Sequence, residues 1–580
     1  MKILGLATMT ESAAVLLEDG VVTAAAEEER FSRVKHQSGI PYRAIEWALE
    51  SRGLQLADLD QVALYWNPYD LAYRARFMAE TALTSPGLFV ERLRRSFTVL
   101  RGPEEGQDAG WLSMFQLEAR LRERFGEPLP PVVSYDHHTC HMASCFYPSP
   151  FEEAAILVMD GAGESACTTS GFGRGTALDV LDQHRLPHSL GHYYSAITGY
   201  LGFGMLDGEY KVMGLCPYGD PSEAATWIRS RFLISPRRGR YELVPGVLDY
   251  HRALRGHFPG AFAAHFGPAR EPGASLDQAH MDLAAGAQLA FEEVVLDMAR
   301  ALRERTGARN LVIAGGCGLN CVANGKLLAE GGFDQIYVPP VPHDAGGALG
   351  AALLAHVRSQ GQRPDRIDHA QFGPDIDPAA VQAALAERSD LSSEALEPSA
   401  LIQRSAETIA AGGIVAWVQG RTEFGPRALG NRSFLADPRR ADVREQINVE
   451  VKQREPFRPF APSIKAERAD DYFELGQPSP FMTIVTPVRP ERRCEIPAVT
   501  HVDGTARPQT VAREVNPRYW ELLDRFEALT GVPLLLNTSF NIQEPIVCTP
   551  REALDTFARS KIAGMALGDH WVTRKASQSS

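Results

Sequence analysis

The chain has 580 residues, and a prior of roughly 150 residues per domain allows about four domains or two larger ones. Lysine and arginine total 59 against 72 aspartates and glutamates, so the net charge is -13, opposite to the balance of a protein that neutralises nucleic-acid phosphates. A hydrophobic fraction of 44% and a charged fraction of 23% exclude wholesale disorder, collagen and coiled coils. We therefore expect small-molecule chemistry and no nucleic-acid partner.

The amino terminus and the cysteines indicate an intracellular protein. Glu11 interrupts the first apolar run before any cleavage site, and no window reaches the roughly 18 uninterrupted apolar residues of a membrane span. The 8 cysteines include no CxxC pair, which argues against zinc ribbons and a disulfide scaffold. The expectation is a cytoplasmic protein without a membrane partner.

Two well-separated segments show the same order of elements. The first has strands at 2–7, 13–17 and 21–26, with a hairpin signal at 18–20. The second has an apolar strand at 154–160, a small-residue turn, and strands at 166–173 and 178–184. This repetition predicts a duplicated α/β architecture with a ligand cleft between the halves, and a chance match between two hairpins is the alternative.

The chain continues with a long helix and then with a second domain. Apolar residues recur at helical spacing over 281–305, and buried strands are expected at 311–316 and 335–340. The polar segment 358–378, rich in proline, glycine and aspartate, is the expected domain boundary. Beyond it, the apolar runs GIVAWVQG and GVPLLLNTSF predict buried strands of a second α/β domain.

A histidine-rich segment at 136–141 predicts a metal site. On a helix, His137 and His141 lie four residues apart and project from one face. Asp160 ends an apolar strand, and Asp344 precedes a small-residue helix in the other half. Two imidazoles and two carboxylates suit iron, manganese or zinc, with positions left open for substrate. The alternative is surface or satisfied core histidines, and His138, on another face, is expected to be structural.

Three glycine-containing turns carry the candidate nucleotide-binding residues of the first domain. Turns without bulky side chains let backbone N–H groups approach a phosphate, although each turn alone is most often a plain turn. The sequence has neither a P-loop nor the dinucleotide-binding fingerprint. The candidates are Gly161, Gly163, Glu209, Lys211, Gly315, Gly316 and Asn320.

Cations gather in short segments of the second half, with phenylalanine and proline residues between them. Guanidinium groups grip phosphate in a bidentate manner, and a lysine adds a point charge. The aromatic neighbours indicate partial burial, and buried arginines need an anionic partner. A solvated surface and a groove for single-stranded RNA are the alternatives. The cations are Arg421, Arg427, Lys452, Arg454, Arg458 and Arg507, and 537–541 could add amide and hydroxyl contacts.

The motifs DHHTCHMAS, VMDGAGES, VPHDAGGALGAAL, GRTEFGPRALGNRSFLADPR, VKQREPFRPFAPS and GVPLLLNTSFNIQEPIV run through nearly the whole chain. In this order they resemble the O-carbamoyltransferases of nodulation-factor, cephamycin and tobramycin biosynthesis. The resemblance implies an ASKHA-type (actin/Hsp70-like) domain at 1–360 and a YrdC-like α/β domain at 370–580. The second domain would convert carbamoyl phosphate and ATP, which binds together with magnesium, to carbamoyl adenylate. The first would transfer the carbamoyl group to a hydroxyl of a natural product, such as a sugar or polyketide, and release AMP.

The resemblance also assigns residues by motif. The set His137, His141, Asp160 and Asp344 matches the metal ligands, and the metal is commonly iron. Lys35 matches a lysine near the transferred group. The carbamoyl phosphate and adenylate-forming pocket would contain Arg427, Lys452, Arg458, Arg507, Asn537 and Ser539.

The chain departs from the family pattern HDxSAAL near its amino terminus. Met9 stands where the family has a histidine, a candidate base for the acceptor hydroxyl. Methionine cannot take a proton, so Glu11 or His36 is expected to substitute. The remaining options are that the acceptor alcohol reaches the metal directly or that the step needs no protein base.

Other functions stay open on the sequence. A tRNA threonylcarbamoyl-type enzyme uses the same two domain types, but the acidic balance and the lack of a long basic arm argue against it. A non-catalytic ASKHA nucleotide-binding module is a further alternative. A hydrogenase-maturation enzyme would be expected to carry CxxC zinc fingers, and the sequence has no CxxC pair. Segments 67–110 and 235–271 are expected to set the choice of acceptor. The oligomeric state is open, with a homodimer as one option.

Overall fold

The computed structural model describes residues 1–68, 115–254 and 256–575, with a few isolated positions between 69 and 114. The chain divides into two compact units. The first comprises Met1–Glu28 and His36–Ile367, and the second comprises Glu29–Lys35 and Asp368–Ser580. Among the described residues, no helix combines the length and apolar character needed to cross a bilayer. Most of segment 67–110, expected to contribute to acceptor choice, lies outside the described residues.

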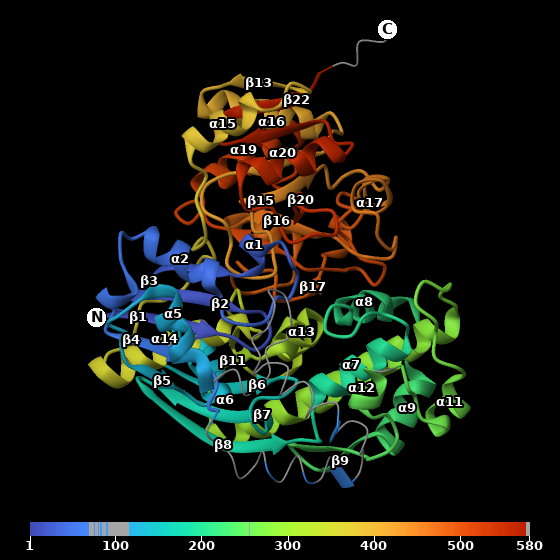
Figure 1. Ribbon diagram of the computed structural model, residues 1–580. Coiled ribbons are helices and arrows are strands. Elements are labelled where there is room, and N and C mark those ends of the chain that lie inside the picture. Colours follow the sequence, from blue (N-terminus) through green and yellow to red (C-terminus); the bar gives the residue numbers. More distant parts are fainter. Residues whose placement is uncertain are drawn as a thin grey trace. The chain divides into compact units, whose positions relative to one another are not determined.

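The first unit contains two five-stranded sheets of the same topology (Figure 1). In each, three antiparallel strands from consecutive hairpins are extended by two parallel strands. This repetition confirms the predicted duplicated α/β architecture of ASKHA type. One sheet has the order β3-β2-β1-β4-β5, from β1 (Lys2–Ala7), β2 (Ala13–Glu18), β3 (Val21–Glu27), β4 (Gln61–Leu64) and β5 (Val132–Ser134). The other has the order β12-β11-β6-β7-β8, from β6 (Glu153–Met159), β7 (Ala166–Arg174), β8 (Ala177–Arg185), β11 (Asn310–Ala314) and β12 (Gln335–Tyr337).

Two helices, α6 (His137–Phe146) and α14 (Ala345–Gln360), pack against each other, and each covers the sheet that does not contain the strand before it. Helix α6 follows β5 but packs on β6 and β11, while α14 follows β12 but packs on β1, β2 and β4. Their close approach depends on Gly350, because a Cβ there would lie 1.9 Å from the carbonyl oxygen of Cys140. The start of α6 and the start of α14 therefore meet.

The long predicted helix is α12 (Gln278–Thr306). Asp277 accepts a hydrogen bond from the backbone N–H of His280, and Gly307, with φ of 69°, ends the helix in the left-handed conformation. These caps explain why the helix extends beyond the apolar periodicity at 281–305. The other helices and the small hairpin of this unit are α2 (Tyr42–Glu50), α5 (Leu117–Phe125), α7 (Leu190–Tyr200), α8 (Glu209–Leu215), α9 (Ser222–Arg231), β9 (Leu233–Arg237), β10 (Arg240–Leu243), α10 (Tyr250–Ala253), α11 (Gly260–Phe266) and α13 (Cys321–Glu330).

The second unit is built on one mixed eight-stranded sheet of order β13-β22-β21-β14-β15-β20-β16-β19. The two predicted apolar strands are β14 (Val415–Val418) and β20 (Leu534–Ser539), separated in the sheet only by β15 (Arg432–Ala436). An α/β second domain is thus confirmed. The remaining elements named on the sheet are β13 (Leu391–Ala395), β16 (Ala461–Lys465), β19 (Gln509–Val511), β21 (Gly564–Leu567) and β22 (His570–Arg574), with helices α15 (Pro378–Ala386), α16 (Pro398–Ala410), α19 (Pro517–Thr530) and α20 (Pro550–Arg559).

The short segment Glu29–Lys35, which includes α1 (Glu29–Ser32), groups with the second unit through two arginines. Arg30 is 2% exposed and donates to the carbonyl oxygen of Gly425 at 2.7 Å. Arg33 donates to the carbonyl oxygens of Pro545 and Ile546 at 2.6 and 2.8 Å. These contacts fasten the segment to loops of the second unit.

Candidate functional site

Four predicted ligands converge in the first unit. The Nε2 atoms of His137 and His141 are 3.1 Å apart, and Asp160 Oδ2 lies 3.2 Å from His137 Nε2. Asp344 Oδ1 lies 3.6 Å from each of these imidazole nitrogens. One ligand atom from each residue lies within 4.8 Å of the others, and the two histidines are fully buried.

This arrangement fits a metal ion. With metal–ligand bonds of about 2.1 Å, tetrahedral or cis-octahedral ligand atoms lie roughly 3.0–3.4 Å from one another. The separations of 3.1 Å between the two imidazole nitrogens and 3.2 Å between His137 and Asp160 lie in this range, and the two separations of 3.6 Å to Asp344 lie just above it. The mixed nitrogen and oxygen set suits several divalent ions, including iron, manganese and zinc.

The charges of the cluster also favour a cation. Burial opposes a charged imidazole, but the carboxylates of Asp344 and Asp160 outweigh burial and raise the pKa of His137 to about 9. Burial would raise the pKa of Asp160, yet its hydrogen bond with His137 and the nearby imidazoles hold that pKa well below its usual range. The carboxylates of the site therefore favour positive charge, and a metal ion would supply it on displacing the imidazole proton.

His138 points away from the four ligands, as expected for a structural residue. Its Nδ1 lies 2.8 Å from the hydroxyl of Thr169 on β7. Burial and the neighbouring His137 lower the pKa of His138 to about 3, so it is neutral. His138 thus ties α6 to the second sheet rather than contributing to the cluster.

The two candidate bases lie together. Glu11 Oε1 is 3.1 Å from His36 Nδ1, and His36 Nε2 is 3.1 Å from Asp207 Oδ1. Burial would raise the pKa of Glu11, but His343 and His36 hold it well below its usual range. Both Glu11 and His36 have positive φ, at 48° and 51°, a strained conformation for non-glycine residues that clusters at functional sites.

Only some of the predicted nucleotide-binding turns meet. The turn containing Gly161 and Gly163 lies beside the turn at Gly315 and Gly316, because the N–H of Gly316 donates to Asp160 Oδ1 at 2.8 Å. A Cβ on Gly315 would lie 2.1 Å from the carbonyl oxygen of Met159, so this close approach needs glycine. These turns therefore adjoin the metal ligands.

The side chains predicted for the same nucleotide site are engaged within the protein. Asn320 caps α13 by accepting from the N–H of Ala323 at 3.1 Å. Glu209 accepts from the N–H groups of Leu206 and Gly208 at 2.9 and 3.1 Å. Lys211 lies over the ring of Phe203, 5.6 Å from its centroid. Asn320 also exchanges hydrogen bonds with the amide of Gln288 on α12, so these side chains are held by other groups of the protein.

In the second unit, Lys452 is 1% exposed and follows a π-helical turn at Gln446–Val451. Its ammonium donates to the carbonyl oxygen of Ser539, to Ser539 Oγ at 3.1 Å and to Asn541 Oδ1 at 2.7 Å. Burial, together with the charges of Arg454 and Arg458, lowers the pKa of Lys452 well below its usual range. Within the described residues, no carboxylate lies within ion-pair distance of Lys452.

The other predicted pocket residues differ in exposure. Arg427, Arg458 and Arg507 are half-buried, whereas Asn537 is 1% exposed. The Asn537 amide donates to Ser463 Oγ at 2.9 Å and to the carbonyl oxygen of Ala428 at 3.2 Å. It therefore supports the loop that carries Arg427. Lys35 is exposed, and its charge contributes to the lowered pKa of Lys452, which places both residues in one cation cluster.

The charged groups that organise this pocket were not predicted. Glu423 is 3% exposed, and its Oε1 accepts from the N–H groups of Leu429, Asn431 and Arg432 at 2.7, 2.8 and 3.3 Å. A carboxylate in the middle of GRTEFGPRALGNR, among so many cations, was the available signal. Glu423 thus closes the loop that presents Arg427.

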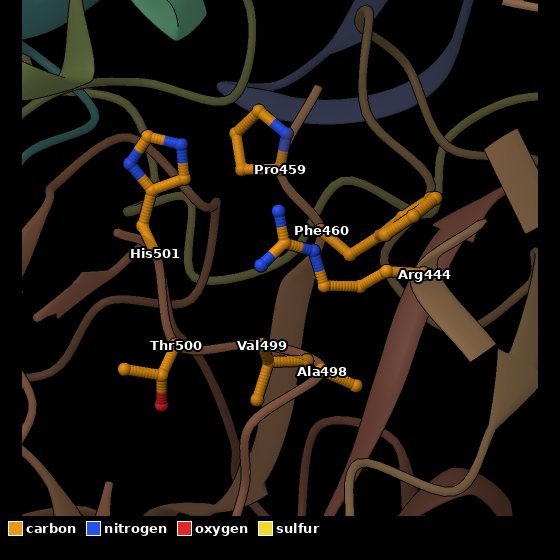
Figure 2. A pocket seen from close by; sticks show the side chains of 7 residues that line it. All are labelled: Arg444, Pro459, Phe460, Ala498, Val499, Thr500 and His501. Carbon is orange, nitrogen blue, oxygen red and sulfur yellow. The ribbon is translucent and has the colours of Figure 1, made fainter. Parts of the chain in front are cut away.

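A small hollow also lies in the second unit. Ligand pockets usually enclose about 300–1,000 Å³, whereas this hollow leaves no enclosed space even for a water molecule. It is therefore too small for carbamoyl phosphate together with ATP, and none of the predicted site residues lines it. Figure 2 shows its lining by Arg444, Pro459, Phe460, Ala498, Val499, Thr500 and His501.

Comparison with known proteins decides the family. The sequence matches the family description "Carbamoyltransferase N-terminus" over residues 2–353 and "Carbamoyltransferase C-terminus" over residues 406–574. The chain belongs to the carbamoyltransferase family. The predicted enzyme class, an O-carbamoyltransferase, is confirmed.

Relatives of this carbamoyltransferase cover nearly its whole length. Nodulation protein NolNO of Sinorhizobium fredii is 40% identical over 98% of this chain and 79% of its own length. An uncharacterized protein of Synechocystis, sll1178, is 41% identical over 98% of this chain and 95% of its own length. Among solved structures, full-length HypF in a phosphate- and nucleotide-bound form is 14% identical, with a TM-score of 0.33 over 62% of this chain and 56% of HypF. A TM-score this low supports no conclusion about function.

Proposed function

We propose that this carbamoyltransferase uses ATP and carbamoyl phosphate to carbamoylate a hydroxyl of a natural product. The observation that carries the proposal is the buried ammonium of Lys452, which among the described residues donates to neutral oxygens and is repelled by the charges of Arg454 and Arg458. Such a charge is costly until an anion joins it. Carbamoyl phosphate and the ATP phosphates are anions of the required kind.

In the second unit, 370–580, water and carbamoyl phosphate would give carbamate and phosphate. The carbamate oxygen would then attack the α-phosphorus of ATP, forming carbamoyl adenylate and releasing pyrophosphate. Lys452 would stabilise charge on the transferring phosphoryl groups, and the guanidinium groups of Arg427, Arg458 and Arg507 would bind phosphate oxygens. Ser539 would orient Lys452, and Asn537 would hold the Arg427 loop. Magnesium would accompany ATP.

In the first unit, 1–360, the carbamoyl group would pass from the adenylate to the acceptor alcohol, with release of AMP. A metal held by His137, His141, Asp160 and Asp344, commonly iron in the resembling family, would supply Lewis acidity when bound. The turns at 161–163 and 315–316 would offer backbone N–H groups to the adenylate phosphate. Lys35, which groups with the second unit and whose charge acts on Lys452, would neutralise charge near the carbamoyl group there.

The Glu11–His36 pair would take over the role of the histidine that Met9 replaces. Glu11 orients His36 through Nδ1, and the pair would receive the proton that the acceptor hydroxyl loses. The acceptor would be a sugar or polyketide hydroxyl, as in antibiotic tailoring. We place the enzyme in the cytoplasm without nucleic-acid or membrane partners, with a homodimer as one possible assembly.

Mass spectrometry after incubation with ATP and carbamoyl phosphate tests the proposal. Carbamoyl adenylate should form with the wild-type enzyme and be lost in Lys452→Ala, while removal of the first unit's metal, with magnesium kept in the assay, should leave its formation intact. With preformed carbamoyl adenylate, metal removal should abolish transfer. Normal transfer by both Glu11→Gln and His36→Ala would reject a base role for these residues. Adenylate formation that depends on threonine and bicarbonate instead would indicate a tRNA-modifying activity, and nucleotide binding without pyrophosphate release would indicate a binding module.

A further inference from the structure

The outward oxygen of Asp344 is held by two hydroxyl groups. The Oγ1 of Thr10 donates to Asp344 Oδ2, and the Tyr65 hydroxyl donates to the same oxygen at 3.4 Å. The other carboxylate oxygen, Oδ1, faces His137 and His141 at 3.6 Å. The two oxygens of Asp344 thus have separate partners.

The second aspartate of the cluster is arranged in the same way. Asp160 Oδ1 accepts from the N–H of Gly316 at 2.8 Å, while Oδ2 faces His137 at 3.2 Å. A hydrogen bond to the outer oxygen fixes the orientation of each carboxylate and leaves its other oxygen facing the imidazoles. Such outer partners orient metal ligands and raise metal affinity.

The direction of the Tyr65 proton is set by its other neighbour. The backbone N–H of Met9 donates to the Tyr65 hydroxyl oxygen at 3.2 Å, so the hydroxyl's own proton is left for Asp344. Tyr65 is fully buried, and its ring lies 5.0 Å from that of His137. A Cβ on Gly347 would lie 2.2 Å from Tyr65 Cδ2, so α14 leaves a glycine-sized space for this ring.

We propose that Thr10 and Tyr65 are positioning residues that fix Asp344 with one oxygen toward the metal. This inference rests on the metal site of the proposed function. Thr10 occupies the position of the aspartate in the pattern HDxSAAL, and an ionised aspartate has no proton to donate to Asp344. The departure at Thr10 therefore gives Asp344 a hydrogen-bond donor that the family pattern does not supply.

Cobalt(II) binding to the full-length chain, after its metal is removed by a chelator, tests the inference without any turnover. Visible absorption reports the cobalt coordination, and competition with a chelator gives the affinity. We expect Thr10→Val and Tyr65→Phe each to weaken cobalt binding about 10-fold or more and to alter the spectrum. Thr10→Ser keeps the hydroxyl and should bind as the wild type does.

Two matched variants control for general effects. Tyr147→Phe removes a hydroxyl of a buried tyrosine that donates to the carbonyl oxygen of Thr176 at 2.9 Å. Thr226→Val removes an exposed threonine hydroxyl that donates to the carbonyl oxygen of Ser222 at 2.7 Å. Both should leave cobalt affinity unchanged, and thermal unfolding of the metal-free proteins shows whether each variant is folded. The inference is overturned if folded Thr10→Val and Tyr65→Phe bind cobalt within twofold of the wild type, or if the wild type binds none. Loss of carbamoyl transfer with cobalt binding as expected would reject only the proposed function.

Discussion

Replacing Glu423 tests how the Arg427 loop is held. Its Oε1 accepts three backbone N–H groups, from Leu429, Asn431 and Arg432, at 2.7 to 3.3 Å. The fully buried Arg432 begins β15 directly after this loop; burial lowers the pKa of its guanidinium, and the charge of Glu423 opposes that shift. Glu423→Gln keeps an acceptor oxygen, whereas Glu423→Ala removes it.

The two substitutions should differ in cost. A buried donor left without a partner costs about 1–3 kcal/mol, so the loss of an acceptor shared by three donors should cost roughly 4–6 kcal/mol after partial relaxation. Glutamine loses only the charge-assisted part of these bonds, which is about 1–2 kcal/mol. The free energy of unfolding should therefore fall several kcal/mol further in Glu423→Ala than in Glu423→Gln.

Denaturant unfolding of the second-unit transition measures these costs, and carbamoyl phosphate-dependent pyrophosphate release reports the loop that carries Arg427. Glu423→Gln should raise the KM for carbamoyl phosphate more than it lowers kcat, because the loop positions a phosphate-binding side chain. Equal losses below about 1 kcal/mol in both variants would show that the three N–H groups do not depend on Glu423.

Two further substitutions test other parts of the structure. Burial raises the pKa of Glu28 from 4.5 to about 7, so its folded form keeps a proton that the unfolded chain loses, and stability falls as pH rises through this window. Glu28→Gln should remove up to about 3 kcal/mol of this loss of stability, measured as the free energy of unfolding at pH 5 and pH 7.5. An equal loss in the wild type and in Glu28→Gln between these pH values would contradict this. Gly350→Ala places a Cβ 1.9 Å from the Cys140 carbonyl oxygen and should lower stability by about 2 kcal/mol or more while weakening cobalt binding. Gly260→Ala, where nothing lies within 4 Å of the added Cβ, is the control, and equal behaviour of both alanine variants would refute the argument.

Much of the fold follows from local signals in the sequence. Alternating apolar runs and turn residues mark β1 to β3 and β6 to β8, and their repetition predicts the duplicated sheets. The spacing of His137 and His141 places both on one face of α6, and Asp160 marks the end of a strand. Local pattern is sufficient here because these side chains lie on regular elements.

Contacts between distant segments could not be predicted in this way. Arg30 reaches Gly425, so the segment Glu29–Lys35 groups with the second unit although its sequence lies within the first. Thr10 and Tyr65 lie near the start of the first unit's sequence, and both donate hydrogen bonds to Asp344 near its end. The small-residue run around Gly350 was visible, but its reason, the approach of α6, depends on how the chain folds back.

Exchange of labelled pyrophosphate into ATP tests the central claim most directly. The account predicts exchange that requires carbamoyl phosphate and persists after the first unit's metal is removed with magnesium still present. The exchange should be lost in Lys452→Ala, while the Tyr147→Phe control exchanges normally. Exchange that proceeds without carbamoyl phosphate, or that survives unchanged in Lys452→Ala, would contradict the formation of carbamoyl adenylate at the buried lysine.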